Sequence, residues 1–218
     1  MARILESNCL CPSLKVVEAA VKVIRAGGVV VAPTDTLYGI LADPFNPDAV
    51  RKVFSIKRRS PDKPLPLLLA ETHYLFKVVK PNPLLWRLAQ RFWPGGLTIV
   101  AEPADNLPEH MAKWGAIGVR LPDCYLTRLI ARYSGGIVVG TSANLSGREN
   151  PNTVYIAYSQ LGEAVDLYID GGPTMKGDPS TVVSVVGGEL ELVREGVVGW
   201  REIVEAAGVN SPVNGSSE

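Results

Sequence analysis

The spacing of apolar residues along the chain predicts helices in several segments. One helix is expected to begin after a Ser13 cap and to end near residue 26, where two glycines follow. Its apolar face consists of Leu14, Val17, Val21 and Ile24. The same signals predict helices over 47–57, 72–79, 83–92, 125–133, 154–161 and 201–206. Asn46 and Asn82 each precede a proline, as is typical of an N-cap followed by the first helical residue.

Short apolar runs between these helices predict strands at 29–32, 65–70, 97–101, 116–121, 137–140, 167–169, 181–186 and 190–193. Pro33 is expected to end the first strand, so that 34–39 forms a polar loop at its carboxyl end, where α/β sheets usually bind ligands. Helices that alternate with strands, without repeats, indicate one α/β domain over residues 1–207 with a mixed sheet. The polar residues 208–218 are expected to form a flexible tail.

The composition excludes some classes of function but does not identify one. The 218 residues are 46% hydrophobic, with 22 basic and 22 acidic side chains, which argues against electrostatic binding of nucleic acid over the whole surface. Cys9, Cys11 and Cys124 lack zinc-site spacing and are expected to be free thiols in a cytosolic protein. His73 and His110 have no partner at metal or catalytic spacing and are expected at the surface. No apolar run is long enough for a signal peptide or a membrane span, so we expect a soluble protein in the cytoplasm.

A cluster of cations interrupts this even balance of charge. Two interpretations are open: the C-terminal dipole of the preceding helix favours cations there, or the cluster binds an anionic ligand. Pro61 and Pro64 stiffen the segment, which lowers the cost of ordering it around a ligand. The cluster comprises Lys57, Arg58, Arg59 and Lys63.

Polar loops at 34–39, 141–147 and 179–181 also follow predicted strands, although such residues are common in ordinary turns. The segment around Ser142 is not a nucleophile elbow, and the chain has no Walker loop or dinucleotide fingerprint. Arg120 and Arg194 end predicted strands, and arginine suits partly buried carboxylates and phosphates. Structural salt bridges are the alternative for both.

Six motifs occur together in one order, and with them the chain resembles the YrdC-like threonylcarbamoyl-AMP synthases over about residues 14–200. This resemblance implies a twisted open mixed sheet with flanking helices around a positively charged concave groove. The motifs are 33–39 (PTDTLYG), 57–59 (KRR) with 63–65 (KPL), 93–98 (WPGGLT), 119–120 (VR), 142–147 (SANLSG) and 179–182 (PSTV).

The resemblance also implies a reaction: L-threonine, bicarbonate and ATP give L-threonylcarbamoyl-AMP and pyrophosphate, for the t6A modification of tRNA. It implies Mg²⁺ held mainly by the ATP phosphates, a downstream threonylcarbamoyl transferase as partner, tRNA contact as an open point, and no membrane. It assigns no residue as an acid or base. The residues implied for threonine are Thr36, Leu68, Arg120, Ser142 and Ser180; for ATP they are Arg59, Lys63, Ala116, Asn144, Asn152 and Arg194; Tyr38 and Lys57 would line the groove.

Some positions depart from the family pattern. Leu68 stands where relatives often have histidine, Ser60 where they often have proline, and Asn152 where they often have threonine. The linker and C-terminal domain of longer relatives are not expected here. Two other functions stay open: a non-catalytic module of this fold that binds double-stranded RNA or tRNA through its basic cluster, and, more remotely, carbamoyl transfer in hydrogenase maturation, which uses a related domain in a larger protein.

Overall fold

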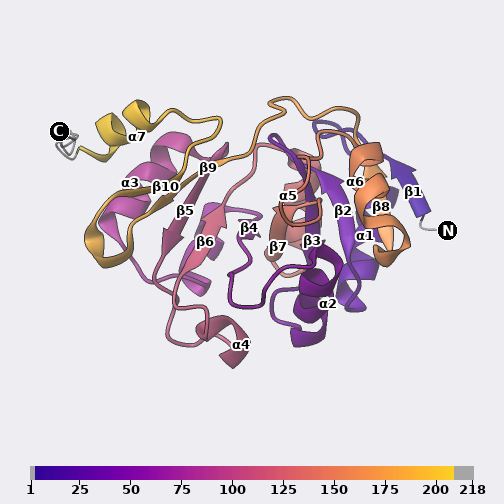
Figure 1. The fold of residues 1–218 in the computed structure, drawn as a ribbon, viewed down its shortest axis with the longest axis horizontal. Helices are drawn as coiled ribbons and strands as arrows, with labels where there is room; N and C mark the ends of the chain where they lie inside the picture. The colour runs from indigo at the N-terminus through magenta and orange to yellow at the C-terminus, as the bar shows by residue number, and fades with distance from the viewer. Residues whose placement is uncertain (1–2, 209–218) are drawn as a thin grey trace.

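The computed structural model describes residues 3–208, which form one ten-stranded mixed sheet with helices on its faces (Figure 1). The order across the sheet is β1-β8-β2-β3-β7-β4-β6-β5-β9-β10. The pairs β1–β8, β2–β8, β4–β6 and β5–β9 are parallel, and the other pairs are antiparallel. The strands are β1 (Arg3–Glu6), β2 (Val30–Pro33), β3 (Tyr38–Ala42), β4 (Leu67–Leu69), β5 (Leu97–Ala101), β6 (Ile117–Arg120), β7 (Ile137–Ser142), β8 (Leu167–Asp170), β9 (Thr181–Ser184) and β10 (Glu191–Arg194).

Four of the predicted helices have the expected bounds. Asn46 and Asn82 cap two of them, because each side chain accepts hydrogen bonds from two backbone N–H groups of the first turn. The α-helices are α1 (Leu14–Arg25), α2 (Pro47–Lys57), α3 (Pro83–Phe92), α4 (Glu109–Ala112), α5 (Tyr125–Tyr133), α6 (Val154–Leu161) and α7 (Trp200–Ala207). Short 3₁₀ helices occupy η1 (Thr72–Lys77), η2 (Gly162–Ala164) and η3 (Val186–Gly188).

Several expectations about local structure were wrong. The loop expected at 34–39 is a tight turn, closed by a hydrogen bond from Thr34 N to Leu37 O (3.1 Å), and Tyr38 begins the unpredicted strand β3. Strand β3 is buried on both faces, so it lacks the alternation that marks a strand in sequence. β1 and α4 were also missed. Leu14 is 63% exposed rather than buried, whereas Val17, Val21 and Ile24 of the same helix are buried as expected.

The two faces of the sheet are covered differently. Residues of β2 alternate between two cores: Val31 joins the core beneath α2, α3 and α6, whereas Val30 and Ala32 pack against α1 and α5. α1 and α5 cover this second face only as far as β4, which is paired with β7. Beyond β4 the same face stays open, and its side chains from β6, β5 and β9 line a cleft. A polar-apolar alternation in these strands, such as Thr98 beside buried Ile99, therefore places polar groups in the cleft.

The expectation of three free thiols was wrong. Cys9 and Cys124 form a disulfide across 115 residues of sequence, and Cys11 is free and exposed. Spacing in the sequence could not show this pairing, because only the fold brings the loop after β1 against the N-terminus of α5.

Apart from Gly208, which ends α7, the tail expected at 208–218 lies outside the described residues. Within residues 3–208, none of the helices combines the length and apolar character needed to cross a bilayer.

Candidate active site

The open face of the sheet carries a cleft of about 540 Å³, a size that suits a small-molecule ligand. It brings together side chains from β4, β6, β7, β9 and β10 and from the turn before β3, which are far apart in the sequence. Nine of the expected site residues line it: Thr36, Tyr38, Arg59, Leu68, Ala116, Arg120, Ser142, Ser180 and Arg194. Lys57, Lys63, Asn144 and Asn152 do not.

Arg120 lies at the base of this cleft and is only 6% exposed. Its Nε donates to Gly95 O (2.8 Å), Nη1 donates to Thr36 Oγ1 (2.7 Å), and Nη2 donates to Asp35 Oδ1. Burial lowers the pKa of Arg120, and the Asp35 carboxylate opposes that shift. A guanidinium has five N–H groups and three are used here, so one N–H on each terminal nitrogen is left for a ligand. Two parallel N–H groups match a carboxylate.

Asp35 is the main residue that the sequence interpretation left unassigned. Its side chain is fully buried, and Oδ1 accepts hydrogen bonds from Arg120 and from Asp123 N (3.1 Å). Lys176 Nζ lies 3.4 Å from Oδ2, an ion pair that no sequence pattern indicated. Asp35 does not line the cleft, so it acts on the site through Arg120. Its place in the motif 33–39 was the only available signal.

Ser180 and Arg194 lie near each other in the lining of the cleft. The Ser180 hydroxyl hydrogen-bonds the Thr98 hydroxyl (2.9 Å), and Arg194 Nη2 donates to Ser180 O (2.8 Å). Antiparallel pairing of β9 and β10 places Arg194 opposite Val182, beside Ser180. Arg194 ends an edge strand whose side chains are all exposed, so its charge remains accessible from the cleft.

Lys57 lies beneath the cleft and not in its wall, contrary to the expectation that it lines the groove. It is 2% exposed, and Nζ donates to Ser142 O, to Asn144 O (2.9 Å) and to Asn144 Oδ1 (3.3 Å). Burial, with a smaller contribution from the charge of Arg59, lowers the pKa of Lys57 to about 7. The three oxygen acceptors favour the ammonium form, which can donate to all of them.

Asn144 is held by the same cluster of contacts. Its Oδ1 also accepts from the Ser142 hydroxyl (2.7 Å), and its Nδ2 donates to Arg148 O (2.9 Å). The side chain thus shapes the start of the loop after β7, and Ser142, the last residue of β7, lines the cleft.

Arg59 reaches the cleft because α2 ends abruptly. Arg58 adopts a left-handed conformation (φ 49°), which turns the chain out of the helix. Arg59 is half-buried, and its guanidinium donates to Lys63 O (3.1 Å) and Pro64 O (2.7 Å). Lys63 is exposed on the same connector, outside the cleft lining, as is Asn152 on the loop before α6.

Leu68 and Tyr38 determine the shape of the cleft more than its polarity. Leu68 packs on Gly140 of β7, where an added Cβ would lie 2.1 Å from Leu68 Cγ. Tyr38 directs its hydroxyl away from the cleft, donating to Gly172 O (2.7 Å), and burial raises its pKa to about 12. The segment that follows β8 runs from there to Ser180 and β9 in the other half of the molecule (Figure 1).

Few groups in the cleft suit a metal ion. Among residues 3–208, no three His, Cys, Asp or Glu side chains converge on one point. Glu191 is the acidic residue in the cleft lining, and the Asp35 carboxylate is already paired. The donor set therefore fits a metal carried by the phosphates of a ligand better than one bound by the protein.

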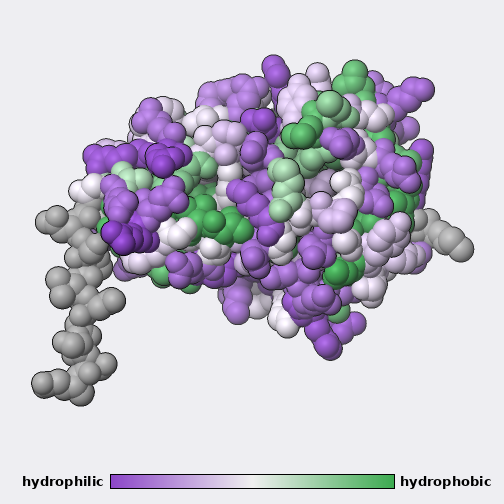
Figure 2. Space-filling view, turned by 90° about the horizontal axis from the view of Figure 1, so that it is seen from above, coloured by the Kyte–Doolittle hydropathy of each residue, from purple (hydrophilic) through white to green (hydrophobic). Residues whose placement is uncertain are grey.

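From above, the surface is mostly hydrophilic, with hydrophobic residues in small separate groups (Figure 2).

The fold and the cleft define an α/β protein with a cleft on an open sheet face, lined by Arg59, Arg120 and Arg194 among other residues. Comparison with known proteins identifies the family of the chain. The model of the Sua5/YciO/YrdC family, described as "Telomere recombination", matches residues 22–196. The chain belongs to this family.

Curated relatives and solved structures agree with that assignment. A Methanocaldococcus jannaschii protein with the provisional name threonylcarbamoyl-AMP synthase is 38% identical over 184 residues, which are 84% of this chain and 87% of that protein. The threonylcarbamoyl-AMP synthase of Bacillus subtilis is 35% identical over 86% of this chain and 55% of its own length. P. abyssi Sua5, solved in complex with L-threonine, aligns with a TM-score of 0.87 at 28% identity, over 95% of this chain and 61% of that one. The chain thus spans about three fifths of P. abyssi Sua5.

Proposed function

We propose that this protein synthesises L-threonylcarbamoyl-AMP from L-threonine, bicarbonate and ATP, with release of pyrophosphate. One observation carries the proposal: a single cleft joins Arg120, with two N–H groups left for a carboxylate, to Arg59 and Arg194 across the same open face. The names of the curated relatives and the threonine complex of P. abyssi Sua5 support the choice of reaction and substrate.

Threonine is assigned to the Arg120 end of the cleft. Its carboxylate would take the two N–H groups of Arg120, beside the hydroxyls of Thr36, Ser142 and Ser180. Leu68, which fills the space over Gly140, would contact its methyl group.

ATP is assigned to the end that Arg59, Ala116 and Arg194 line. Lys63 would contribute its charge from the connector, and Asn144 would act by shaping the Ser142 loop. Asn152 lies outside the lining, and its role in ATP binding is the weakest of these assignments. Mg²⁺ would be held mainly by the phosphates.

The chemistry demands charge compensation more than an acid or a base. The threonine amine attacks bicarbonate with loss of water, or CO2 with loss of a proton, to give a carbamate. The carbamate oxygen then attacks the α-phosphorus, from which pyrophosphate departs. Carboxylate, carbamate and phosphates repel one another as they approach, and fixed cations reduce that repulsion in the transition state. Holding the reactants together contributes as well, by up to about 7–11 kcal/mol in favourable cases.

The product would pass to a threonylcarbamoyl transferase that modifies tRNA, and we place the reaction in the cytoplasm. Direct contact with tRNA is not required by this assignment. A disulfide in that compartment is exposed to reducing conditions.

The test is pyrophosphate release from ATP by the full chain, together with detection of threonylcarbamoyl-AMP by mass spectrometry. We expect release only when threonine and bicarbonate are both present. Equal release with serine, or without bicarbonate, would contradict the proposal. RNA binding with a steep salt dependence, unaffected by Ser142→Ala and Ser180→Ala and without pyrophosphate release, would favour the RNA-binding alternative instead.

A further inference from the structure

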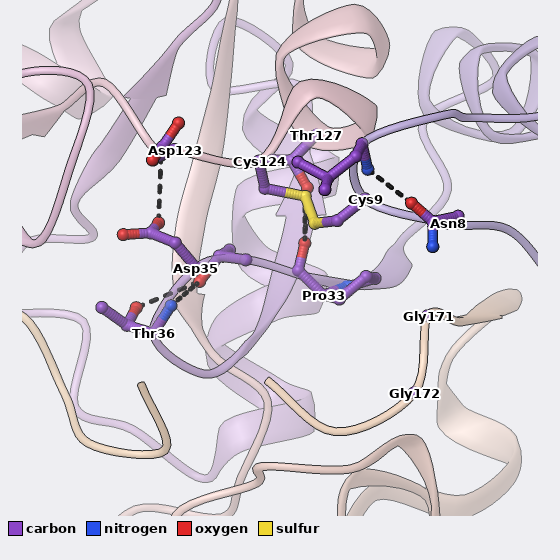
Figure 3. The surroundings of a disulfide bond; sticks show 12 residues. Asn8, Cys9, Pro33, Asp35, Thr36, Asp123, Cys124, Thr127, Gly171 and Gly172 are labelled. Carbon is purple, nitrogen blue, oxygen red and sulfur yellow. Dashed lines mark hydrogen bonds between the residues drawn. A yellow bond between two sulfur atoms is a disulfide. The ribbon is translucent and has the colours of Figure 1, made fainter. Parts of the chain in front are cut away.

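The Cys9–Cys124 disulfide lies close to Pro33 and to the segment that carries Asp35 and Thr36 (Figure 3). Cys124 is the N-cap residue of α5, and the residue before it, Asp123, donates its backbone N–H to Asp35 Oδ1 (3.1 Å). The same carboxylate oxygen accepts from Arg120 Nη2. A short series of contacts thus leads from the disulfide to the guanidinium that we assign to threonine.

Asp35 has few other restraints. Among the described residues, its Oδ2 accepts no hydrogen bond and has only the ion pair with Lys176, at 3.4 Å. Within residues 3–208, Asp123 N is therefore the one uncharged donor to this carboxylate. The direction of Arg120 depends on the orientation of the carboxylate, because a guanidinium binds a carboxylate well only in a narrow geometry.

The disulfide in turn fixes Asp123. It ties the start of α5 to the loop after β1, which is itself held by a hydrogen bond from Leu126 N to Cys9 O (3.0 Å) and by the Asn8 side chain, which accepts from Leu10 N and Cys11 N. On the other side, Thr127 Oγ1 donates to Pro33 O (2.6 Å), two residues before Asp35. Figure 3 shows Asn8, Pro33 and Thr127 around the sulfur atoms.

We propose that Asp35 positions Arg120 and that the Cys9–Cys124 disulfide holds Asp35 in place, so that the affinity for threonine depends on the oxidation state of this disulfide. The inference rests on the proposed function, since it takes Arg120 as the threonine-binding group. It adds a control on threonine and none on ATP. Among the described residues, neither Arg59 nor Arg194 forms a hydrogen bond or ion pair with Asp35 or Asp123, and Arg194 acts on Arg120 only through its charge.

The chemistry of the change is thiol–disulfide exchange with a dithiol reductant. One thiolate of the reductant attacks the sulfur of half-buried Cys9 and releases the Cys124 thiolate, which the N-terminus of α5 stabilises. The second thiol of the reductant then displaces Cys9, so that the reductant ends as a disulfide and both cysteines end as thiols.

The experiment compares the full chain in its oxidised and reduced states. Thiol titration should find one free thiol, Cys11, in the oxidised protein and three after reduction. We expect reduction to raise the KM for threonine about threefold to tenfold, as for weakening one hydrogen bond, and to leave the KM for ATP unchanged. Inhibition by L-threoninol, which lacks the carboxylate, should not change.

Two variants control for other effects. Cys9→Ser should have the higher threonine KM with or without reductant, whereas Cys11→Ser should respond to reduction as the wild type does. If the disulfide only stabilises the fold, its reduction should lower the melting temperature of the protein but should not cause this selective loss of threonine affinity.

The results distinguish a failure of this inference from a failure of the proposed reaction. Equal threonine KM values at one and three free thiols would overturn the inference, as would three free thiols in the protein before reduction. Parallel losses for threonine and L-threoninol would overturn the positioning role of Asp35. If no state turns over but calorimetry detects redox-dependent threonine binding, the proposed reaction fails and the inference stands.

Discussion

Arg120 and Arg59 face the same cleft, but their charges are held in different ways. Arg120 is buried against the Asp35 carboxylate, and three of its N–H groups are already bound. Arg59 is half-buried and donates only to two backbone carbonyls; within residues 3–208 no carboxylate pairs with it. A compensated, fixed guanidinium recognises a ligand by geometry, whereas an uncompensated one attracts it mainly by charge. The threonine end should therefore be selective, and the phosphate end should respond to salt.

The largest expected effect comes from breaking the compensated end. Arg120→Met removes two charge-assisted hydrogen bonds to threonine, and we expect at least about a 100-fold loss of threonine affinity by calorimetry. It also leaves the Asp35 carboxylate buried without its main partner, which should lower the free energy of unfolding by about 3–5 kcal/mol.

Arg120→Lys separates these two effects. The lysine keeps the charge beside Asp35 but not the planar pair of donors, so stability should largely recover while threonine affinity does not. Recovery of both would mean that charge alone, and not geometry, determines binding at this end.

At the uncompensated end, Arg59→Ala should weaken ATP by about 1.5–3 kcal/mol, or roughly 10-fold to 150-fold, if Arg59 contacts a phosphate. Stability should change little, since the lost hydrogen bonds lie on a surface connector. Arg201→Ala, a fully exposed arginine paired with Glu205, is the matched control and should leave ATP binding unchanged. Unchanged ATP affinity in Arg59→Ala would assign this arginine to the solvated end of α2.

The buried Lys57 predicts a pH dependence of stability. Because its pKa is lowered from 10.5 to about 7 on folding, the unfolded chain holds more protons at this residue between these two values. The free energy of unfolding should thus rise with pH over this window, by at most about 1.4 kcal/mol per pH unit, and be independent of Lys57 below pH 7.

Urea unfolding from pH 6.5 to 9.5 measures that slope. Lys57→Met should remove it, and Lys22→Met, at an exposed position of α1, should not. The same slope in all three proteins would show that Lys57 keeps its proton through its three oxygen partners.

The smallest effect is expected for Lys63, an exposed cation near the phosphate end. Lys63→Ala should weaken ATP about twofold to fivefold at low salt, and the difference should vanish near 0.5 M salt because exposed charges are screened. A loss that persists at high salt would place Lys63 in direct contact with the phosphates.

Local signals in the sequence were sufficient for much of the fold. Asn46-Pro47 and Asn82-Pro83 defined the starts of α2 and α3, since capping depends on neighbouring residues. β3 was missed because a strand buried on both faces has no alternation. Nine of the expected site residues line the cleft, and six of these belong to the motifs, whereas Lys57 and Asn144 are buried outside its lining.

The sequence by itself determined the class of domain, most helices and the set of polar loops, because spacing, caps and turn chemistry act over a few residues. Only the tertiary structure decided which distant residues meet: Arg120 with Asp35 across 85 residues, Lys57 with Ser142 across 85, and Cys9 with Cys124 across 115. Such pairs depend on how α5 and the strands pack, and a buried charge must find its partner there because water no longer solvates it. The basic cluster shows both levels: its motif, together with the others of the family, predicted an anion site, and in the fold Arg59 lines the cleft, Lys57 is buried and Lys63 is exposed.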